Sequence, residues 1–263
     1  MIERRETDGV VYYRSPLLAR AGVPHAFSTR IGGVSPVPFD SLNLGNPSDG
    51  DVRDDGDRIH ENYRRLQRTI GWDGRERAWV HQVHGADVAQ ARRSDGAFRS
   101  GCRADAMVGD DPQRLLAVRV ADCVPVLVST QDGRTVAAIH AGWRGVVAGV
   151  VTNTIAGLGD ARNLLAAIGP CIAVDAFEVG PEVLDAFDQA FGDNAPIARG
   201  AAGKGQVDLR AAVRLQLLRA GIAADRIDTT DRCTHRDAGE FFSHRRERGV
   251  TGRMAAVIAP RAT

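Results

Sequence analysis

The chain has 263 residues, of which 43% are hydrophobic and 25% are charged, a composition typical of a globular protein. Its 34 Lys and Arg residues and 33 Asp and Glu residues give a formal net charge of +1. This balance predicts neither nucleic acid nor an anionic membrane as a partner. The first residues contain no apolar stretch of signal-peptide length, and no segment approaches the roughly 20 apolar residues of a membrane span. We therefore expect a cytoplasmic location and no membrane partner.

The N-terminal part combines a loop and a helix. Residues 25–45 (HAFSTRIGGVSPVPFDSLNLG) begin like a short strand and continue with Gly, Pro, Ser and Asn, which predicts a shaped loop. Residues 51–71 predict an amphipathic helix that stops at Gly71. Its apolar residues recur at helical spacing, at Ile59, Tyr63, Leu66 and Ile70.

The remainder of the chain alternates between strand-like and helix-like segments. The patterns predict strands over 78–91 (interrupted at Gly85), 115–130, 135–143, 164–173 and 253–259. They predict helices over 144–159, 181–191 and 209–221. No internal repeat or linker divides the sequence, so we expect one domain over residues 1–263 with a mixed α/β, or α+β, fold.

Three short segments carry candidate metal ligands: HQVHG (81–85), ADC (121–123) and IHAGWRG (139–145). Zinc favours imidazole together with thiolate, and a catalytic zinc usually has three protein ligands and one open position. If residues 81–84 form a strand, His81 and His84 point to opposite faces and only one can serve. We prefer His84, because Gly85 allows the backbone to bend beside it. The candidate set is therefore His84, Cys123 and His140, although the spacing alone leaves buried structural residues as an alternative.

The other cysteines do not suggest a second metal site. Cys102, Cys171 and Cys233 are widely separated and form no CxxC pair with each other or with Cys123. We expect them to be packed as small hydrophobic residues without disulfides.

Five segments resemble a known family in order and in sequence: HQVHGADV, ADAMVGDDPQRLLAVRVADCVPVL, AAIHAGWRGVVAGVV, AAIGPCIAVDAFEVGPEV and FFSHRRERGVTGRMAAVI. Together with HAFSTRIGGVSPVPFDSLNLG, they closely resemble the YfiH/laccase-domain family of purine nucleoside phosphorylase-like proteins, also called polyphenol oxidases. The resemblance covers residues from about 25 to 259. It implies a single-domain α/β/β/α sandwich and a catalytic metal on His84, Cys123 and His140.

The resemblance also implies an activity. It implies a zinc-dependent purine nucleoside phosphorylase that acts on adenosine, inosine and methylthioadenosine and releases the base and ribose 1-phosphate. Adenosine deaminase activity and weak polyphenol oxidation, with Cu²⁺ in the same site, are side activities to expect. The partners would be a nucleoside and phosphate, and the protein would be a monomer or a homodimer.

Phosphorolysis needs a phosphate held beside C1′ of the ribose. Arg30 and then Arg144 are the candidates for holding it, because the planar guanidinium matches an oxyanion bidentately. Ser28 is a hydroxyl donor in the same loop as Arg30. Asn43 is a candidate for contacting ribose or base, although an Asx-turn explains it equally well.

Three other functions compete with this interpretation. A multicopper laccase needs roughly ten histidines for its blue-copper and trinuclear centres, whereas this chain has 7. A metal-free hydrolase with Cys123 as nucleophile and His84 or His140 as base uses the same residues. Such an enzyme would suit amide cleavage in a cell-wall peptidoglycan precursor. The third alternative is a non-enzymatic binding module.

Overall fold

The computed structural model describes residues 1–47, 51–72, 76–95 and 98–262. Its first sheet has six strands in the order β1-β2-β3-β15-β7-β4. In that order they span Glu3–Thr7, Val10–Arg14, His25–Ser28, Met254–Ile258, Arg114–Val120 and Glu76–Trp79. All neighbours are antiparallel except β4 and β7. The two ends of the chain therefore meet in this sheet, where β15 lies between β3 and β7.

The second sheet also has six strands, in the order β14-β10-β8-β9-β6-β5. They span Ile227–Asp228, Leu164–Ile168, Val124–Thr130, Val136–Ala141, Ala106–Gly109 and Val88–Ala91. A small third sheet, β11-β13-β12, consists of Glu178–Val179, Gly205–Val207 and Ile197–Arg199. Short 3-10 turns occur at Arg93–Asp95, Ala161–Asn163, Val174–Ala176, Gly192–Asn194, Ala201–Gly203 and Ala224–Arg226.

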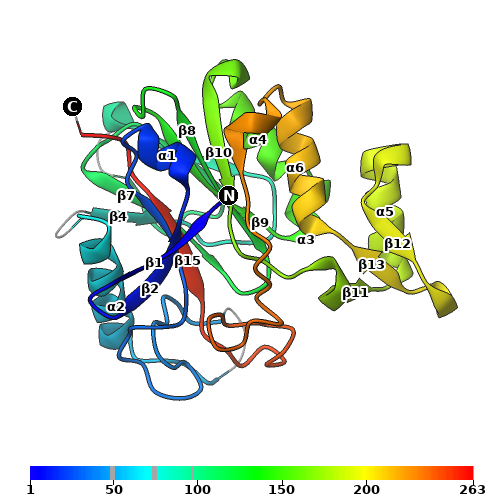
Figure 1. Ribbon diagram of the computed structural model, residues 1–263, viewed down its shortest axis with the longest axis horizontal. Coiled ribbons are helices and arrows are strands. Elements are labelled where there is room, and N and C mark those ends of the chain that lie inside the picture. Colours follow the sequence, from blue (N-terminus) through cyan, green and yellow to red (C-terminus); the bar gives the residue numbers. More distant parts are fainter. Residues whose placement is uncertain (48–50, 73–75, 96–97, 263) are drawn as a thin grey trace.

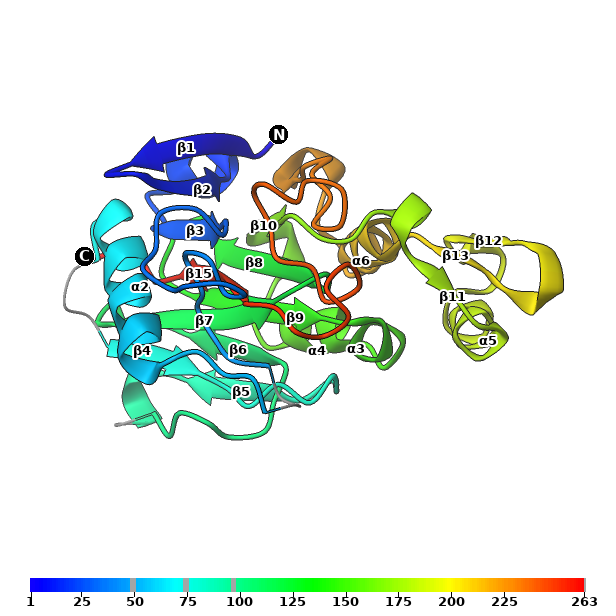
Figure 2. The ribbon, with the colours of Figure 1, turned by 90° about the horizontal axis from the view of Figure 1, so that it is seen from below.

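Helices cover the outer faces of the two large sheets (Figure 2). Helix α2 lies against the first sheet, whereas α3, α4 and α6 lie against the second. Helix α5 and the small sheet project beyond them (Figure 1). The helices α1 to α6 span Pro16–Arg20, Gly56–Thr69, Trp143–Val147, Val150–Ala156, Pro181–Phe191 and Leu209–Arg219. This arrangement confirms the mixed α/β fold and its helix–sheet–sheet–helix layers.

Three apolar clusters hold these layers together, as expected when each sheet face buries its side chains against a neighbouring layer. The cluster between the sheets includes Leu116, Val118, Leu127, Ala138 and Ile258. Helix α2 buries Tyr63 and Leu66 on the first sheet, and Asp55 caps its first turn by accepting a hydrogen bond from the Asp57 N–H. The amphipathic pattern over 51–71 therefore located this helix correctly.

Two sequence-based expectations need correction. Residues 115–130 are not one strand: they form β7 and β8, which belong to different sheets and are joined by a turn at Ala121–Cys123. Residues 144–159 are not one helix, because Gly149 adopts a φ of 85° between α3 and α4. The first correction matters for the site, because it places Cys123 where the chain crosses between the sheets.

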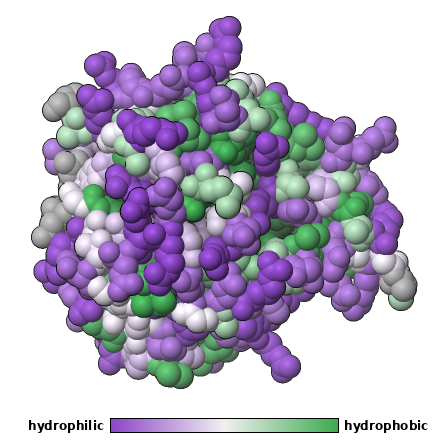
Figure 3. Space-filling view, viewed as in Figure 1, coloured by the Kyte–Doolittle hydropathy of each residue, from purple (hydrophilic) through white to green (hydrophobic). Residues whose placement is uncertain are grey.

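The surface is largely polar on the face shown in Figure 3, where apolar residues occur in small separate groups. None of the helices in the described part of the chain is long and apolar enough to cross a bilayer.

His25 is a completely buried titratable residue at the start of β3. Its Nδ1 donates to the Val23 carbonyl at 2.7 Å, and its Nε2 accepts from the Ser15 N–H at 2.8 Å. Both ring nitrogens are thus satisfied only when the imidazole is neutral. Burial is the main reason that the pKa of His25 falls from 6.5 to about 4.

We therefore expect acid to destabilise the fold through His25. The unfolded chain takes up the proton near pH 6.5 and the folded chain only near pH 4, so stability is complete above pH 6.5 and is lost as pH falls toward 4. The loss should reach about 3 kcal/mol. Urea unfolding of metal-free protein between pH 7.5 and 4.5 measures it. The His25→Gln variant should be less stable at pH 7.5 but should show a flatter pH dependence; equal slopes for both proteins would refute the assignment.

Candidate metal centre

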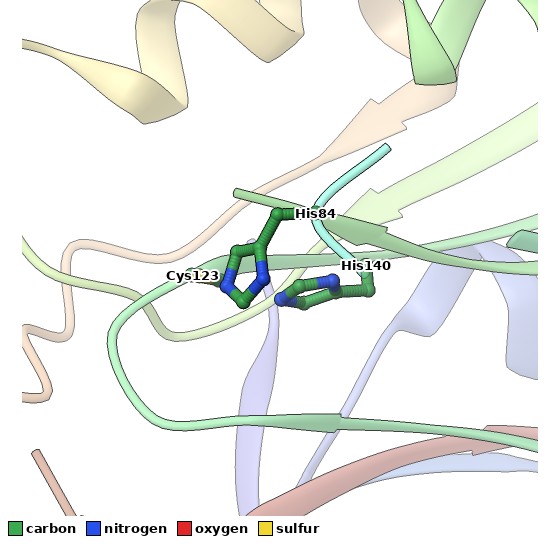
Figure 4. A group of neighbouring side chains, drawn as sticks. All are labelled: His84, Cys123 and His140. Atoms are coloured by element: carbon green, nitrogen blue, oxygen red, sulfur yellow. The ribbon is translucent and has the colours of Figure 1, made fainter. Parts of the chain in front are cut away.

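The structure brings His84, Cys123 and His140 together. One ligand atom from each lies within 4.8 Å of those of the other two. His84 lies in the connection between β4 and β5, Cys123 in the turn between β7 and β8, and His140 near the end of β9. The two imidazole rings meet edge to face with centroids 4.9 Å apart, beside Cys123 (Figure 4). His84 is exposed, Cys123 is half-buried and His140 is buried.

His84 is held in an unusual backbone conformation. Its φ is 59°, in the left-handed region that non-glycine residues seldom adopt. The strand predicted over 78–91 ends at Trp79 and resumes only at Val88, so strand alternation does not decide between His81 and His84. The premise of a continuous strand was therefore wrong, whereas the backbone does bend at His84 and Gly85.

The carboxylate of Asp105 stabilises this bend. It accepts hydrogen bonds from the backbone N–H groups of Val83, His84 and Gly85, at 3.2, 2.9 and 2.7 Å. Three successive N–H groups that converge on one anion form a backbone nest. Asp105 has no exposed surface, so these bonds replace the water that its charge has lost.

Asp105 also fixes the ring of His140. The Nδ1 of His140 donates to Asp105 Oδ1 at 2.8 Å, which directs Nε2 away from the carboxylate. Burial alone would lower the pKa of His140, but the Cys123 thiolate and Asp105 outweigh burial and raise it to about 9. One buried carboxylate thus orients two of the three candidate ligands, an arrangement typical of metal sites.

Cys123 is predisposed to be a thiolate. Burial alone would raise the pKa of its thiol, but the attraction of His140 and hydrogen bonds from His140 and His84 lower it to about 6. The preceding residue, Asp122, has a φ of 86°. Its carboxylate accepts from the Thr234 hydroxyl and from the Arg245 N–H, each at 2.7 Å. These bonds hold the turn that presents Cys123.

A glycine is needed beside the ligands. A Cβ placed on Gly142 would lie 2.8 Å from Cδ2 of His84 and 3.2 Å from Sγ of Cys123. Gly142 follows β9 and precedes α3, so its bare backbone lets that connection pass directly against two ligands.

The residues predicted to bind substrate do not belong to the His84–Cys123–His140 cluster. The Arg30 guanidinium already donates to the Asp40 carbonyl, the Asp40 carboxylate and the Ala238 carbonyl, and it stacks on Phe242. It lines an open cavity of about 270 Å³ together with Ile31, Asp40, Ser41, Ala238 and Gly239. Arg144 is exposed at the start of α3 and lies over the ring of Trp143.

Ser28 and Asn43 are buried, and their polar atoms are engaged within the protein. The Ser28 hydroxyl accepts from the Ala255 N–H at 2.9 Å. Asn43 donates to Asp54 and accepts from the N–H groups of Gly45 and Arg253. Substrate contacts by these two residues, and by Arg30 and Arg144, stay predictions.

Comparison with known proteins places this geometry in a family. The family model described as "Multi-copper polyphenol oxidoreductase laccase" matches residues 24–261. The chain belongs to this laccase-like YfiH family. This chain is 41% identical to purine nucleoside phosphorylase YfiH of Escherichia coli K12 over 240 residues, which cover 90% of this chain and 93% of the relative. The purine nucleoside phosphorylase PA4543 of Pseudomonas aeruginosa is 38% identical, covering 91% of this chain and 94% of the relative.

Solved structures of this laccase-like family have the same fold. YlmD from Geobacillus stearothermophilus superposes with a TM-score of 0.87 at 33% identity, over 98% of each chain. Protein NMB0706 from Neisseria meningitidis gives a TM-score of 0.82 at 35% identity, over 99% of each chain. The family membership and the His–Cys–His cluster together suggest a metal site.

Sequence reasoning missed Asp105. Asp105 links the bend at His84 to the ring of His140. In the sequence, only its position directly before the strand β6 distinguishes it from other acidic residues. An acidic residue directly before a fully apolar strand is a weak signal that its carboxylate has internal partners.

Proposed function

We propose that this protein is a zinc-dependent purine nucleoside phosphorylase, active on adenosine, inosine and methylthioadenosine. Phosphate would attack C1′ of the ribose, the bond from C1′ to the purine nitrogen would break, and the products would be the free base and ribose 1-phosphate. The observation that carries the proposal is the His84–Cys123–His140 cluster in a chain whose relatives are named purine nucleoside phosphorylases.

The donor set fits zinc. Two imidazole nitrogens and one thiolate form the kind of three-ligand set found in catalytic zinc sites, and the same set could take copper. A zinc ion, when bound, supplies a Lewis acid at this position. Asp105 holds the Nδ1–H of His140, so Nε2 is the nitrogen that would bind the metal, in place of its own proton. The low pKa of Cys123 keeps its sulfur in the anionic form that binds metal.

The remaining predictions belong to this proposal. Adenosine deamination and weak copper-dependent polyphenol oxidation would be side activities of the same cluster. The 7 histidines are too few for a multicopper centre, so any phenol oxidation would depend on one ion. We also propose a single domain, a cytoplasmic location and a monomer or homodimer, with nucleoside and phosphate as the partners.

A product assay tests the proposal. Purified protein is incubated with adenosine, with and without phosphate, and ribose 1-phosphate, adenine and inosine are resolved. We expect adenine and ribose 1-phosphate in equal amounts only when phosphate is present, whereas inosine would report deamination. If neither adenosine nor inosine releases base in the presence of phosphate, the protein is not a nucleoside phosphorylase.

The second candidate is a Cys/His hydrolase that cleaves an amide in a peptidoglycan precursor. It is favoured by the lowered pKa of Cys123 and by its contact with His140, which together describe an activated thiol nucleophile. Such an enzyme would keep full activity after chelation of metal, whereas the phosphorylase proposed here would lose it.

A further inference from the structure

Two arginines, Arg119 and Arg253, lie on neighbouring chain segments of the first sheet. Arg119 on β7 is the partner of Ala255 on β15, in an antiparallel pairing. Arg253 directly precedes β15, two residues from Ala255, so the two arginines project from the same face as diagonal neighbours. Trp79 on β4 is paired with Ala117, which places its ring on this face as well, with the Arg119 guanidinium 5.7 Å from the ring centroid.

Neither arginine forms an ion pair with a carboxylate in the described part of the chain, although both are half-buried. The described residues give the Arg119 guanidinium no hydrogen-bond acceptor, only the ring of Trp79. Arg253 donates from Nη1 to the carbonyls of Thr251 and Gly252, at 2.9 and 3.0 Å. Within the described residues, its Nε and Nη2 are therefore still available.

Burial and the neighbouring charges shift the pKa of Arg253. Burial is the largest cause that lowers the pKa of Arg253, and repulsion from Arg119 lowers it further. The Cys123 thiolate and Asp122 act in the opposite direction but do not compensate. The Asp122 carboxylate is itself engaged by Thr234 and Arg245. Two half-buried cations without a carboxylate partner are unfavourable unless an anion binds between them.

Neighbouring residues hold the main chain of both arginines in place. The Gln82 carboxamide bonds to the N–H and the carbonyl of Arg119, at 2.8 and 2.7 Å, and Gln82 lies two residues before His84. Asn43 accepts from the Arg253 N–H at 2.9 Å. A Cβ on Gly45 would approach Cδ of Arg119 at 2.6 Å, so the loop packs directly on this side chain. The SLNLG loop thus contacts both arginines.

We propose that Arg119 and Arg253 form an oxyanion-binding site for inorganic phosphate, next to the metal centre. Two guanidinium groups on one face can each donate two N–H bonds to a tetrahedral oxyanion. Arg119 lies four residues before Cys123 in the sequence, and its main chain is bonded to Gln82, two residues before His84. This placement suits the second substrate of a phosphorolysis, so the inference deepens the proposed function and rests on it. It assigns phosphate to arginines other than Arg30 and Arg144.

Calorimetric titration of the zinc-loaded full chain with inorganic phosphate tests this site, at constant ionic strength and without nucleoside. We expect Arg119→Gln and Arg253→Gln each to weaken binding about tenfold, and the double variant about a hundredfold. Arg119→Lys should fall between the wild type and Arg119→Gln, because it keeps the charge but loses the fork. Zinc content should stay at the wild-type level in every variant.

Arg77→Gln is the matched control, because Arg77 is a half-buried arginine on β4 that also lies over an aromatic ring, that of Tyr63. It should bind phosphate like the wild type. The inference is overturned if the wild type shows no saturable phosphate binding, if the double variant binds within twofold of it, or if Arg77→Gln causes an equal loss. It is also overturned if Arg30→Gln or Arg144→Gln removes binding while the double variant does not.

The two proposals can fail separately. Phosphate binding that depends on Arg119 and Arg253, without release of base from a nucleoside, would refute only the proposed function. Phosphorolysis with an unchanged phosphate KM in the double variant would refute only the phosphate site. Should the double variant fail to fold, Arg119→Gln alone decides, because this side chain is partly exposed.

Discussion

Replacing Cys123 with alanine should remove both the bound metal and the phosphorolytic activity. The thiolate is the only anionic ligand of the His84–Cys123–His140 cluster, and it lies at the turn where β7 passes into β8. A Lewis acid contributes several kcal/mol of transition-state stabilisation, so its loss should lower kcat/KM by about a thousandfold or more. Metal analysis of protein purified without added metal should give about one zinc per wild-type chain and none in the variant.

Cys102→Ala is the matched control for this experiment. Cys102 is also a free, partly buried cysteine, and it packs in the cluster between the sheets without joining the ligand cluster. This variant should keep its zinc and its activity. A Cys123→Ala protein that retained a full complement of zinc would exclude Cys123 as a ligand. Wild-type activity that survived complete removal of zinc would instead favour the thiol nucleophile.

The layered fold could be predicted where local pattern and burial agree. Helix α2 follows the apolar spacing of Tyr63 and Leu66, and α6 lies where residues 209–221 predict it. The crossing at Ala121–Cys123 could not be predicted in the same way. Residues on both sides of it are β-branched and buried, so their pattern reads as one continuous strand. Only the tertiary structure separates β7 and β8 into two sheets.

The ligand set could be predicted from residue chemistry and family resemblance, but the reason for its geometry could not. Strand alternation was applied to residues 81–84, which do not form a strand, and it selected His84 for the wrong reason. What presents His84 is a left-handed backbone held by a carboxylate 21 residues later in the chain. A long-range bond of this kind leaves no periodicity in the sequence.

The Arg30 prediction illustrates a related limit. Arginine in a motif suggests anion binding, but the sequence does not reveal whether a guanidinium is already occupied. Arg30 is bonded to Asp40 and to two carbonyl groups, whereas Arg119 and Arg253 are not paired with carboxylates in the described residues. This pair without carboxylate partners could not be predicted from sequence, because only the pairing of β7 with β15 brings together residues 134 positions apart.

Asp105→Asn should weaken zinc binding about ten- to a hundredfold while leaving the fold intact, in line with the effect of removing the group that orients a metal ligand. Each carboxylate oxygen accepts two bonds: Oδ1 from His84 N–H and His140 Nδ1, and Oδ2 from the N–H groups of Val83 and Gly85. Asparagine can retain the first pair, but its amide nitrogen would then face two N–H donors. The left-handed bend at His84 should therefore relax and move that ligand away from Cys123 and His140.

Competition with a chromogenic chelator measures the zinc affinity, and thermal melting of the metal-free protein reports on the fold independently of the metal. Asp87→Asn is the matched control, because Asp87 is an exposed aspartate two residues after the nest, and it should bind zinc like the wild type. An Asp105→Asn affinity within twofold of the wild-type value would show that His84 and His140 need no carboxylate to orient them. A selective loss of zinc affinity, with the metal-free melting temperature nearly unchanged, would instead identify Asp105 as the residue that couples the two histidine ligands.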